Sequence, residues 1–324
     1  MVEEPPFVDR GAELSELLSL AERGFYPVLY LYGPEGCGKT RLLRELYSRL
    51  RGRRDYVTVY VDAQSMESVE EAVYAPPGIV RAVLEAAREL AGPPGRVAAL
   101  ALLSAMRIVK RLYAVGKHVV ILVDDVARPL GLEVIEAYSK SLLNLVEELL
   151  EAGAETVLAI ATTSEGLSRS LLARHNYVSI RQLWNLDPDS YAELLQALGA
   201  PKDVTEEAWR SLGGNPRLAL ALRARGWSLQ RLEDDLYPGI RAVLEDIAPR
   251  HRRELEEVVE DVDALLEHPE LRRKLLEASL VTPVDRPCLG YTPPIDPELG
   301  IGRYYAWQTP LHRRLARRYL EELG

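Results

Sequence analysis

The sequence predicts an α/β fold with a mainly parallel sheet, followed by two smaller domains that are rich in helix. Three observations carry this prediction. Apolar runs typical of strands alternate with amphipathic helical patterns up to about residue 182, as expected of consecutive βαβ units. A glycine-rich segment at residues 33–40 joins the first apolar run to a helical pattern. After residue 185 the strand-like runs give way to helical patterns.

The strands of the sheet are expected at five places, each a short apolar run. They are residues 28–32, 56–61, 118–123, 156–161 and 177–180. A long helical insert separates the second run from the third, and turn signals rich in proline and glycine divide it. Residues 133–152 place their apolar side chains on one stripe, which is typical of a helix packed on a sheet.

Three domains are predicted: an α/β domain at residues 1–185, a helical lid at 186–237 and a winged-helix-like domain at 238–324. Asp187 or Asp189 can cap the first helix of the lid. The second boundary is placed at Tyr237-Pro238-Gly239 because this tripeptide is typical of a turn. In the last domain, helices precede a short β-like run at residues 304–307 and a final basic helix.

Composition narrows the class of protein. With 47% hydrophobic and 27% charged residues, the chain is that of a folded soluble protein. Two distant cysteines favour a reducing compartment, and no apolar run approaches the ~20 residues that span a bilayer. We therefore expect a cytoplasmic protein without a membrane partner. The net charge of −9 argues against general coating of nucleic acid, and few thermolabile residues occur, as in thermophiles.

The most informative motif is G-x-x-x-x-G-K-T, the pattern of a phosphate-binding loop. Its glycines let backbone N–H groups turn toward phosphate oxygens, and the helix that follows adds partial positive charge. Lys39 would reach the β- and γ-phosphates and Thr40 would hold Mg²⁺. The candidate nucleotide-binding residues here are Gly33, Pro34, Glu35, Gly36, Cys37, Gly38, Lys39, Thr40 and Arg41. Cys37 is either a small residue at a tolerant position or a point where oxidation blocks the site.

A second set of candidates follows the third predicted strand. Asp124 and Asp125 come directly after a continuous apolar run, at the carboxyl end where α/β proteins bind ligands. We expect Asp124 to contact Mg²⁺, directly or through water, and Asp125 to be the base that activates the attacking water. The alternative is that one of the two caps a turn.

Polar residues also follow the fourth predicted strand. Thr162 or Thr163 could sense the γ-phosphate and hold the attacking water, but the register does not distinguish them. For an arginine that stabilises charge in the transition state, we favour Arg174 over Arg169 and Arg181, with a solvated surface residue as the alternative. The five histidines are scattered, so zinc is not expected.

These motifs together resemble the archaeal ATPases of the STAND/AAA+-like phosphate-loop class. The resemblance includes F-x-x-R-x-x-E-L at residues 7–14, the two aspartates after an apolar strand, and Gly214-Asn215-Pro216 in the lid. It implies ATP and Mg²⁺ as ligands, a helical lid and a C-terminal winged helix. It also implies that Val8 and Arg10 line the adenine side, and that Pro216 packs near the base or ribose. In origin-recognition-type AAA+ ATPases an arginine in the equivalent part of the lid reaches the γ-phosphate, but this chain departs from their motif by keeping the proline, so the resemblance does not assign that role to Arg217.

The resemblance leaves more than one function open. The first is an ATP-driven conformational switch with slow hydrolysis and a winged helix that binds a partner. The second is a DNA-binding AAA+-type ATPase, replication-initiator-like or transposition-accessory, that contacts double-stranded DNA through the winged helix. The third is a scaffold with little hydrolysis, formed with another protein or by self-association. Arg313, Arg314, Arg317 and Arg318 give the last helix a basic side that favours the second.

Overall fold

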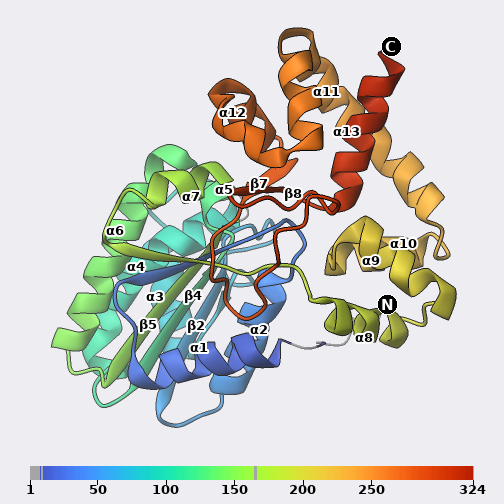
Figure 1. Ribbon diagram of the computed structural model, residues 1–324. Coiled ribbons are helices and arrows are strands. Elements are labelled where there is room, and N and C mark those ends of the chain that lie inside the picture. Colours follow the sequence, from blue (N-terminus) through green and yellow to red (C-terminus); the bar gives the residue numbers. More distant parts are fainter. Residues whose placement is uncertain (1–7, 9, 164–165, 324) are drawn as a thin grey trace. The chain divides into compact units, whose positions relative to one another are not determined.

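The computed structural model describes residues 8, 10–163 and 166–323, and its contacts divide them into two compact units (Figure 1). The sheet unit comprises residues 10–32 and 39–181. The C-terminal unit comprises residues 182–323 together with the loop at residues 33–38 and Val8. Each unit has its own buried core, and the two are described separately below.

The sheet unit contains a six-stranded sheet in the order β3-β2-β4-β5-β1-β6. Its strands are β1 (Val28–Tyr32), β2 (Tyr56–Asp62), β3 (Val73–Tyr74), β4 (His118–Asp124), β5 (Thr156–Thr163) and β6 (Val178–Gln182). Strands β2, β4, β5 and β1 run parallel, and β3 runs antiparallel to its neighbour β2. The mainly parallel sheet predicted from the sequence is confirmed. The carboxyl ends of its parallel strands therefore meet at one edge.

Helices cover both faces of this sheet (Figure 1), as the burial of nearly every residue in β1, β2, β4 and β5 requires. Helices α1 (Gly11–Arg23) and α2 (Lys39–Leu50) contact each other and the sheet. Helix α6 (Leu132–Glu151) contacts β5, and α4 (Pro94–Tyr113) contacts β2 and packs on α3 (Pro77–Ala87). The short helices α5 (Ala127–Leu130) and α7 (Gly166–Leu172) contact α6.

The side chains of each strand point alternately to the two faces of the sheet. Val57, Val59 and Val61 of β2 belong to the core shared with α3, α4 and α6. Because successive strand residues point to opposite faces, Thr58 and Tyr60 face the other side, where α2 contacts β2. This alternation places Tyr60 beside the helix that follows the glycine-rich loop.

The C-terminal unit is mainly helical. Its helices are α8 (Pro188–Ala197), α9 (Thr205–Leu212), α10 (Pro216–Ala224), α11 (Leu229–Glu260), α12 (Pro269–Glu277) and α13 (Pro310–Glu322), with 3-10 turns at Lys202–Val204 and Val262–Leu266. Asp187 caps α8 as predicted, by accepting from the N–H groups of Asp189 and Ser190. The short strands β7 (Val281–Pro283) and β8 (Tyr305–Trp307) pair antiparallel.

The turn predicted at residues 237–239 is wrong. Helix α11 continues through Pro238 and breaks instead at His251, where φ is −131° and ψ is 22°. A proline inside a helix removes one backbone hydrogen bond. Here Tyr237, Ile240 and Leu244 are buried and α11 packs against α13, which offsets that loss. The division into a lid and a third domain near this position stays a prediction.

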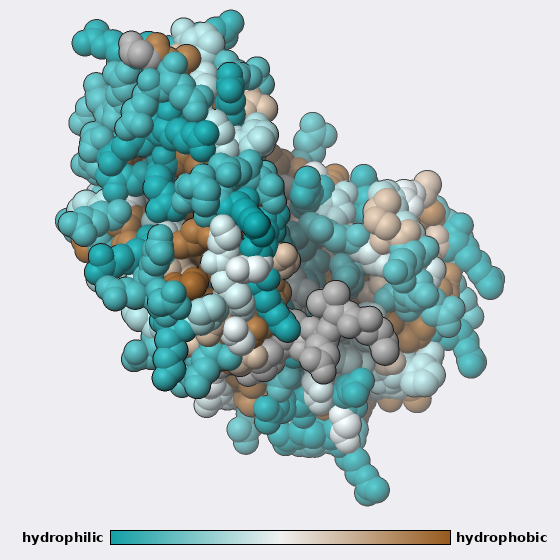
Figure 2. Space-filling model, turned by 90° about the vertical axis from the view of Figure 1, so that its right-hand side faces the viewer, coloured by the Kyte–Doolittle hydropathy of each residue, from teal (hydrophilic) through white to brown (hydrophobic). Residues whose placement is uncertain are grey.

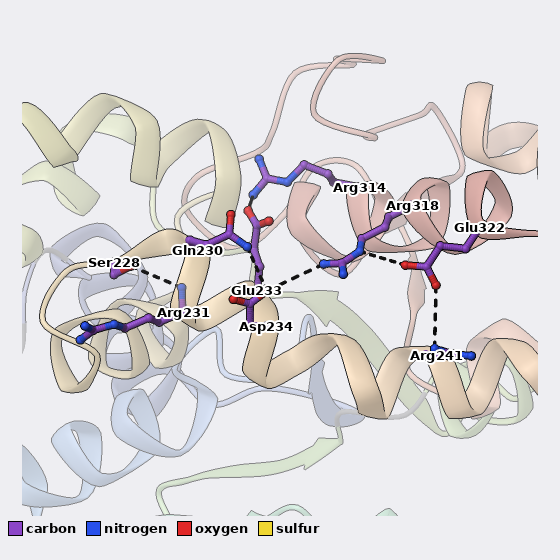
Figure 3. A network of polar contacts seen from close by, with 9 residues as sticks. All are labelled: Ser228, Gln230, Arg231, Glu233, Asp234, Arg241, Arg314, Arg318 and Glu322. Atoms are coloured by element: carbon purple, nitrogen blue, oxygen red, sulfur yellow. Dashed lines mark hydrogen bonds and ion pairs between the residues drawn. The ribbon is translucent and has the colours of Figure 1, made fainter.

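The arginines of α13 do not form a free basic face, contrary to expectation (Figure 3). Arg314 pairs with Glu233, Arg318 lies 3.2 Å from Glu322, and Arg317 bonds Glu260 at 2.9 Å. Arg313 donates to the carbonyl oxygen of Val259 at 2.6 Å. The reason is that α11 presents acidic residues and its carboxyl-terminal carbonyls along the side on which α13 packs.

The helices and one face of the surface bear on whether the chain could cross a membrane. Among the described residues, no helix combines the length and the apolar character that crossing a bilayer requires. The face drawn in Figure 2 is covered mainly by hydrophilic side chains, with hydrophobic ones in small separate groups.

Candidate functional site

The glycine-rich loop at residues 33–38 forms the tight turn that its sequence predicted. Gly36 and Gly38 have φ values of 79° and 105°, which side chains other than glycine rarely adopt. A Cβ added to Gly36 would lie 2.6 Å from the Cβ of Arg217, so the position also lacks room for a side chain. Glycine at these positions therefore allows the backbone to adopt the conformation of the loop.

Helix α2 begins immediately after this loop, at Lys39. Its first turn contains Lys39, Thr40 and Arg41 and no acidic residue. The positive end of the helix is therefore not neutralised from within, which favours an anion at this point. Lys39 is buried apart from 8% of its surface, whereas Thr40 is exposed.

Asp124 ends β4 as a buried carboxylate that accepts two hydrogen bonds. The Thr162 hydroxyl donates to Asp124 Oδ1 at 2.6 Å, and the Tyr60 hydroxyl donates to Asp124 Oδ2 at 2.9 Å. Thr162 Oγ1 also accepts from the backbone N–H of Asp125 at 2.7 Å. The structure thus brings Asp124, Asp125 and Thr162 together at the carboxyl edge of the sheet.

Asp125 is held in a left-handed conformation with φ of 51°. Aspartate is one of the few residues other than glycine that tolerate this region. Its Oδ2 accepts from Gln64 Nε2 at 2.5 Å, so the carboxylate is oriented by a residue just beyond β2. Gln64 was not predicted from the sequence. Only the register that pairs Asp62 with Asp124 brings it to this place.

The structure separates Thr162 from Thr163, which the sequence could not do. Thr163 Oγ1 lies 2.7 Å from Ser168 Oγ, whereas Thr162 bonds the two aspartates. Successive residues of β5 point to opposite faces, so only Thr162 can approach the carboxylates. Ser164, which follows them, lies outside the described residues.

The three candidate arginines lie in different surroundings. Arg181 pairs with Glu16 of α1. The guanidinium carbon of Arg169 lies 5.5 Å from the centre of the Tyr32 ring. Arg174 lies two residues beyond α7 with an exposed side chain. Arg174 therefore stays the candidate of the three that is most accessible to solvent.

The residues assigned to the base and ribose are less well defined by their contacts. Arg10 is buried and pairs with Glu13 at 2.7 Å, which orients it along α1. Val8 is partly buried, and Phe7 and Asp9 of the same motif lie outside the described residues. Pro216 is the first residue of α10, directly after the helix cap Asn215.

Within the C-terminal unit, three side chains converge on Glu35 of the glycine-rich loop. Asn215 Nδ2 donates to the Glu35 carbonyl at 2.8 Å, and Arg217 pairs with the Glu35 carboxylate at 2.6 Å. The Glu35 N–H donates to Gln308 Oε1 at 3.0 Å, and Gln308 is 5% exposed. Sequence reasoning missed Gln308, because a contact across 273 positions leaves no local pattern.

The two residues predicted to hold Mg²⁺ both carry side-chain oxygen atoms. Among the described residues, no group of three His, Cys, Asp or Glu side chains could hold a metal ion. Thr40 and Asp124 offer hydroxyl and carboxylate oxygens, and Mg²⁺ typically takes few protein ligands of this kind, together with phosphates and water. Burial, with the nearby charge of Asp124, raises the pKa of Tyr60, so its hydroxyl remains a donor.

The sequence of this chain was compared with protein families and with curated proteins. The sequence pattern of a family described as an ATPase domain predominantly from Archaea matches residues 7–222. The comparison with curated proteins gave no match.

The chain is also similar in structure to several solved proteins. For AMPPCP-bound DnaA from Aquifex aeolicus the identity is 17% and the TM-score 0.42, covering 79% of this chain and 75% of that one. For a RuvB variant from Thermotoga maritima the identity is 16% and the TM-score 0.43, covering 86% and 91%. For Cdc6p from Pyrobaculum aerophilum the identity is 16% and the TM-score 0.41, covering 100% of this chain and 97% of that one.

Proposed function

This chain belongs to a family of ATPase domains found predominantly in Archaea, and from this premise we propose that it is an ATP-driven conformational switch. ATP binds with Mg²⁺ at the glycine-rich loop and is hydrolysed slowly. The C-terminal unit includes a winged-helix-like module that binds a partner and responds to the nucleotide. AAA+-like character, with a helical lid after the sheet, is part of this proposal.

The residues have the following roles in the proposal. Residues 33–41 hold the phosphates, with Lys39 on the β- and γ-phosphates. Thr40 and Asp124 hold Mg²⁺, which neutralises charge that develops on the phosphates. Asp125 accepts a proton from the attacking water, Thr162 orients Asp124 and Asp125, and Arg174 stabilises the transition state from this chain or a neighbour. Val8, Arg10 and Pro216 contact the nucleoside.

The main support for the proposed switch is the hydrogen bond that the Glu35 N–H donates to Gln308. A backbone N–H of the phosphate loop is here bound by a side chain that lies between β8 and α13. Binding of phosphates draws the N–H groups of such a loop inward. A change in the loop would therefore alter the Gln308 contact and the start of α13. The pairing of Arg217 with Glu35 gives α10 a second link to the same loop.

Gln308→Ala tests this coupling. We expect the variant to bind ATP within about fivefold of the wild type, since the lost bond is worth about 1 kcal/mol and 1.4 kcal/mol is a factor of ten in affinity. Amide hydrogen exchange in α13 should differ between ADP and a non-hydrolysable ATP analogue in the wild type, and this difference should be lost in the variant. Gln196→Ala, at an exposed position of α8, is the matched control. An undiminished difference in Gln308→Ala would remove Gln308 from the switch.

A second candidate function is binding of double-stranded DNA through α13, in the manner of a replication-initiator-like or transposition-accessory ATPase. Its support is four arginines on one helix, of which Arg314, Arg317 and Arg318 have side chains 43–46% exposed. Their pairing with α11 opposes it, because DNA phosphates would have to replace partners already in place.

The variant Arg317→Gln/Arg318→Gln separates the two candidates. If the arginines serve the α11–α13 contact, the variant should lose about 1 kcal/mol of stability, a small effect because the ion pairs are partly exposed. Its DNA affinity should remain within about threefold of the wild type. The measurements are thermal unfolding and DNA binding at 50 and 200 mM salt. Steep salt dependence in the wild type that flattens in the variant would instead favour the DNA-binding candidate.

A further inference from the structure

We propose that Tyr60 is a positioning residue that fixes the carboxylate of Asp124 for Mg²⁺, an inference that rests on the proposed function. Tyr60 lies two residues before the carboxyl end of β2 and is 2% exposed. Its hydroxyl donates to Asp124 Oδ2 at 2.9 Å. All the residues involved lie in the sheet unit.

The position of Tyr60 follows from the register of the sheet. Tyr60 of β2 is paired with Leu122 of β4, and Asp62 with Asp124. Side chains two residues apart on a strand lie on the same face, so Tyr60 and Asp124 share the face covered by α2. The length of the tyrosine side chain spans the remaining distance to the carboxylate.

Neighbouring rings hold the Tyr60 ring in this orientation. The ring centres of Tyr47 and Tyr74 lie 6.1 and 5.7 Å from that of Tyr60, tilted by 48° and 62°. Aromatic pairs in this range stabilise one another beyond their buried area. The hydroxyl of Tyr60 therefore has little freedom to leave Asp124.

Thr162 and Tyr60 each donate to a different oxygen of the Asp124 carboxylate. An ionised carboxylate has about four acceptor positions, two on each oxygen. Thr162 occupies one on Oδ1 and Tyr60 one on Oδ2. Each oxygen keeps one free position in a fixed plane. Asp124 could thus coordinate Mg²⁺, or accept a hydrogen bond from a water on it, without first rotating.

Arg44 connects Tyr60 to the helix that carries Thr40. Arg44 Nε donates to the Tyr60 hydroxyl at 3.3 Å, and its NH2 group lies 3.5 Å from Asp62 Oδ2. Residues four apart lie on the same side of a helix, so Arg44 follows Thr40 along one side of α2. Arg44 thus contacts Tyr60, and Tyr60 contacts Asp124. These contacts connect the helix that carries Thr40 to the carboxylate of Asp124.

This arrangement predicts a specific defect in Tyr60→Phe. The ring and its packing remain, but Asp124 loses one of its two donors. Loss of such an outer partner typically weakens metal affinity 10- to 100-fold. We expect the Mg²⁺ concentration at half-maximal binding of an ATP analogue to rise about tenfold. Binding of the analogue in EDTA should stay within about twofold of the wild type.

The controls are Tyr47→Phe and Tyr74→Phe, which remove hydroxyls from the same ring cluster without touching Asp124. Both should keep the wild-type Mg²⁺ midpoint. Arg44→Gln, which changes a partly exposed side chain, should raise the midpoint less than Tyr60→Phe does. Thermal unfolding checks that each variant is folded, and calorimetry at increasing Mg²⁺ gives the midpoint.

The outcomes separate this inference from the function on which it rests. Nucleotide binding by the wild type that does not respond to Mg²⁺ would overturn both. If the wild type responds to Mg²⁺ and Tyr60→Phe has the same midpoint as the two control variants, the positioning role alone is rejected. An equal rise in all three tyrosine variants would also reject it, since it would point to packing of the ring cluster.

Discussion

Replacing Lys39 with alanine will weaken the binding of Mg·ATP by about a hundredfold or more. Lys39 begins α2 directly after the glycine-rich loop and is largely buried. A hydrogen bond from its ammonium group to phosphate is charge-assisted, and bonds of this class contribute about 1.5–3 kcal/mol. Since 1.4 kcal/mol is a factor of ten in affinity, loss of the contact together with the charge accounts for the size of the effect.

Calorimetry with a non-hydrolysable ATP analogue measures this loss. Lys140→Ala is the matched control, because Lys140 is an exposed lysine on α6 of the same unit. Alanine favours helix at both positions, so neither change should disturb folding. Wild-type affinity in Lys39→Ala would show that the glycine-rich loop is not the nucleotide site, and the proposed function would fall with it.

Asp125→Asn will bind Mg·ATP normally but hydrolyse it about 10²- to 10⁴-fold more slowly. The range is that of a lost general base. Asparagine tolerates the left-handed backbone of this position, and its side-chain oxygen can still accept from Gln64. Geometry therefore survives while basicity is removed. Single-turnover hydrolysis at saturating Mg²⁺ isolates the chemical step.

Asp124→Asn provides the contrast to this variant. It should shift the Mg²⁺ concentration needed for nucleotide binding, because its carboxylate is assigned to the metal. Asp125→Asn should leave that concentration unchanged. Turnover of Asp125→Asn equal to that of the wild type would remove Asp125 from the mechanism, whatever the result for Asp124.

The sheet was predictable from the sequence because its strands are buried on both faces. Continuous apolar runs such as residues 28–32 and 118–123 of the printed sequence leave little choice of structure. The two-residue strand β3 gave no such signal. Pro238 misled the prediction, because the packing that keeps α11 helical involves residues distant in sequence.

The candidate site was predictable only where its residues follow one another in the chain. The loop at residues 33–40 and the pair Asp124 and Asp125 could be recognised as local patterns. Thr162 could be selected over Thr163 only from the direction of its side chain in β5. Tyr60 and Gln64 reach the two aspartates, and Gln308 reaches the glycine-rich loop, through pairing and packing over long sequence distances. A single sequence does not record these contacts.

The hydrogen bond of Gln308 to the glycine-rich loop limits how this protein can be divided. The family match ends at residue 222, yet a partner of its phosphate loop lies at position 308. A gene fragment cut at the family boundary would keep every residue assigned to ATP but lose an acceptor of the Glu35 N–H. A chimaera that exchanges the tail would need an equivalent acceptor to keep this hydrogen bond. The residues beyond the family match therefore supply a contact to the glycine-rich loop that the matched residues alone lack.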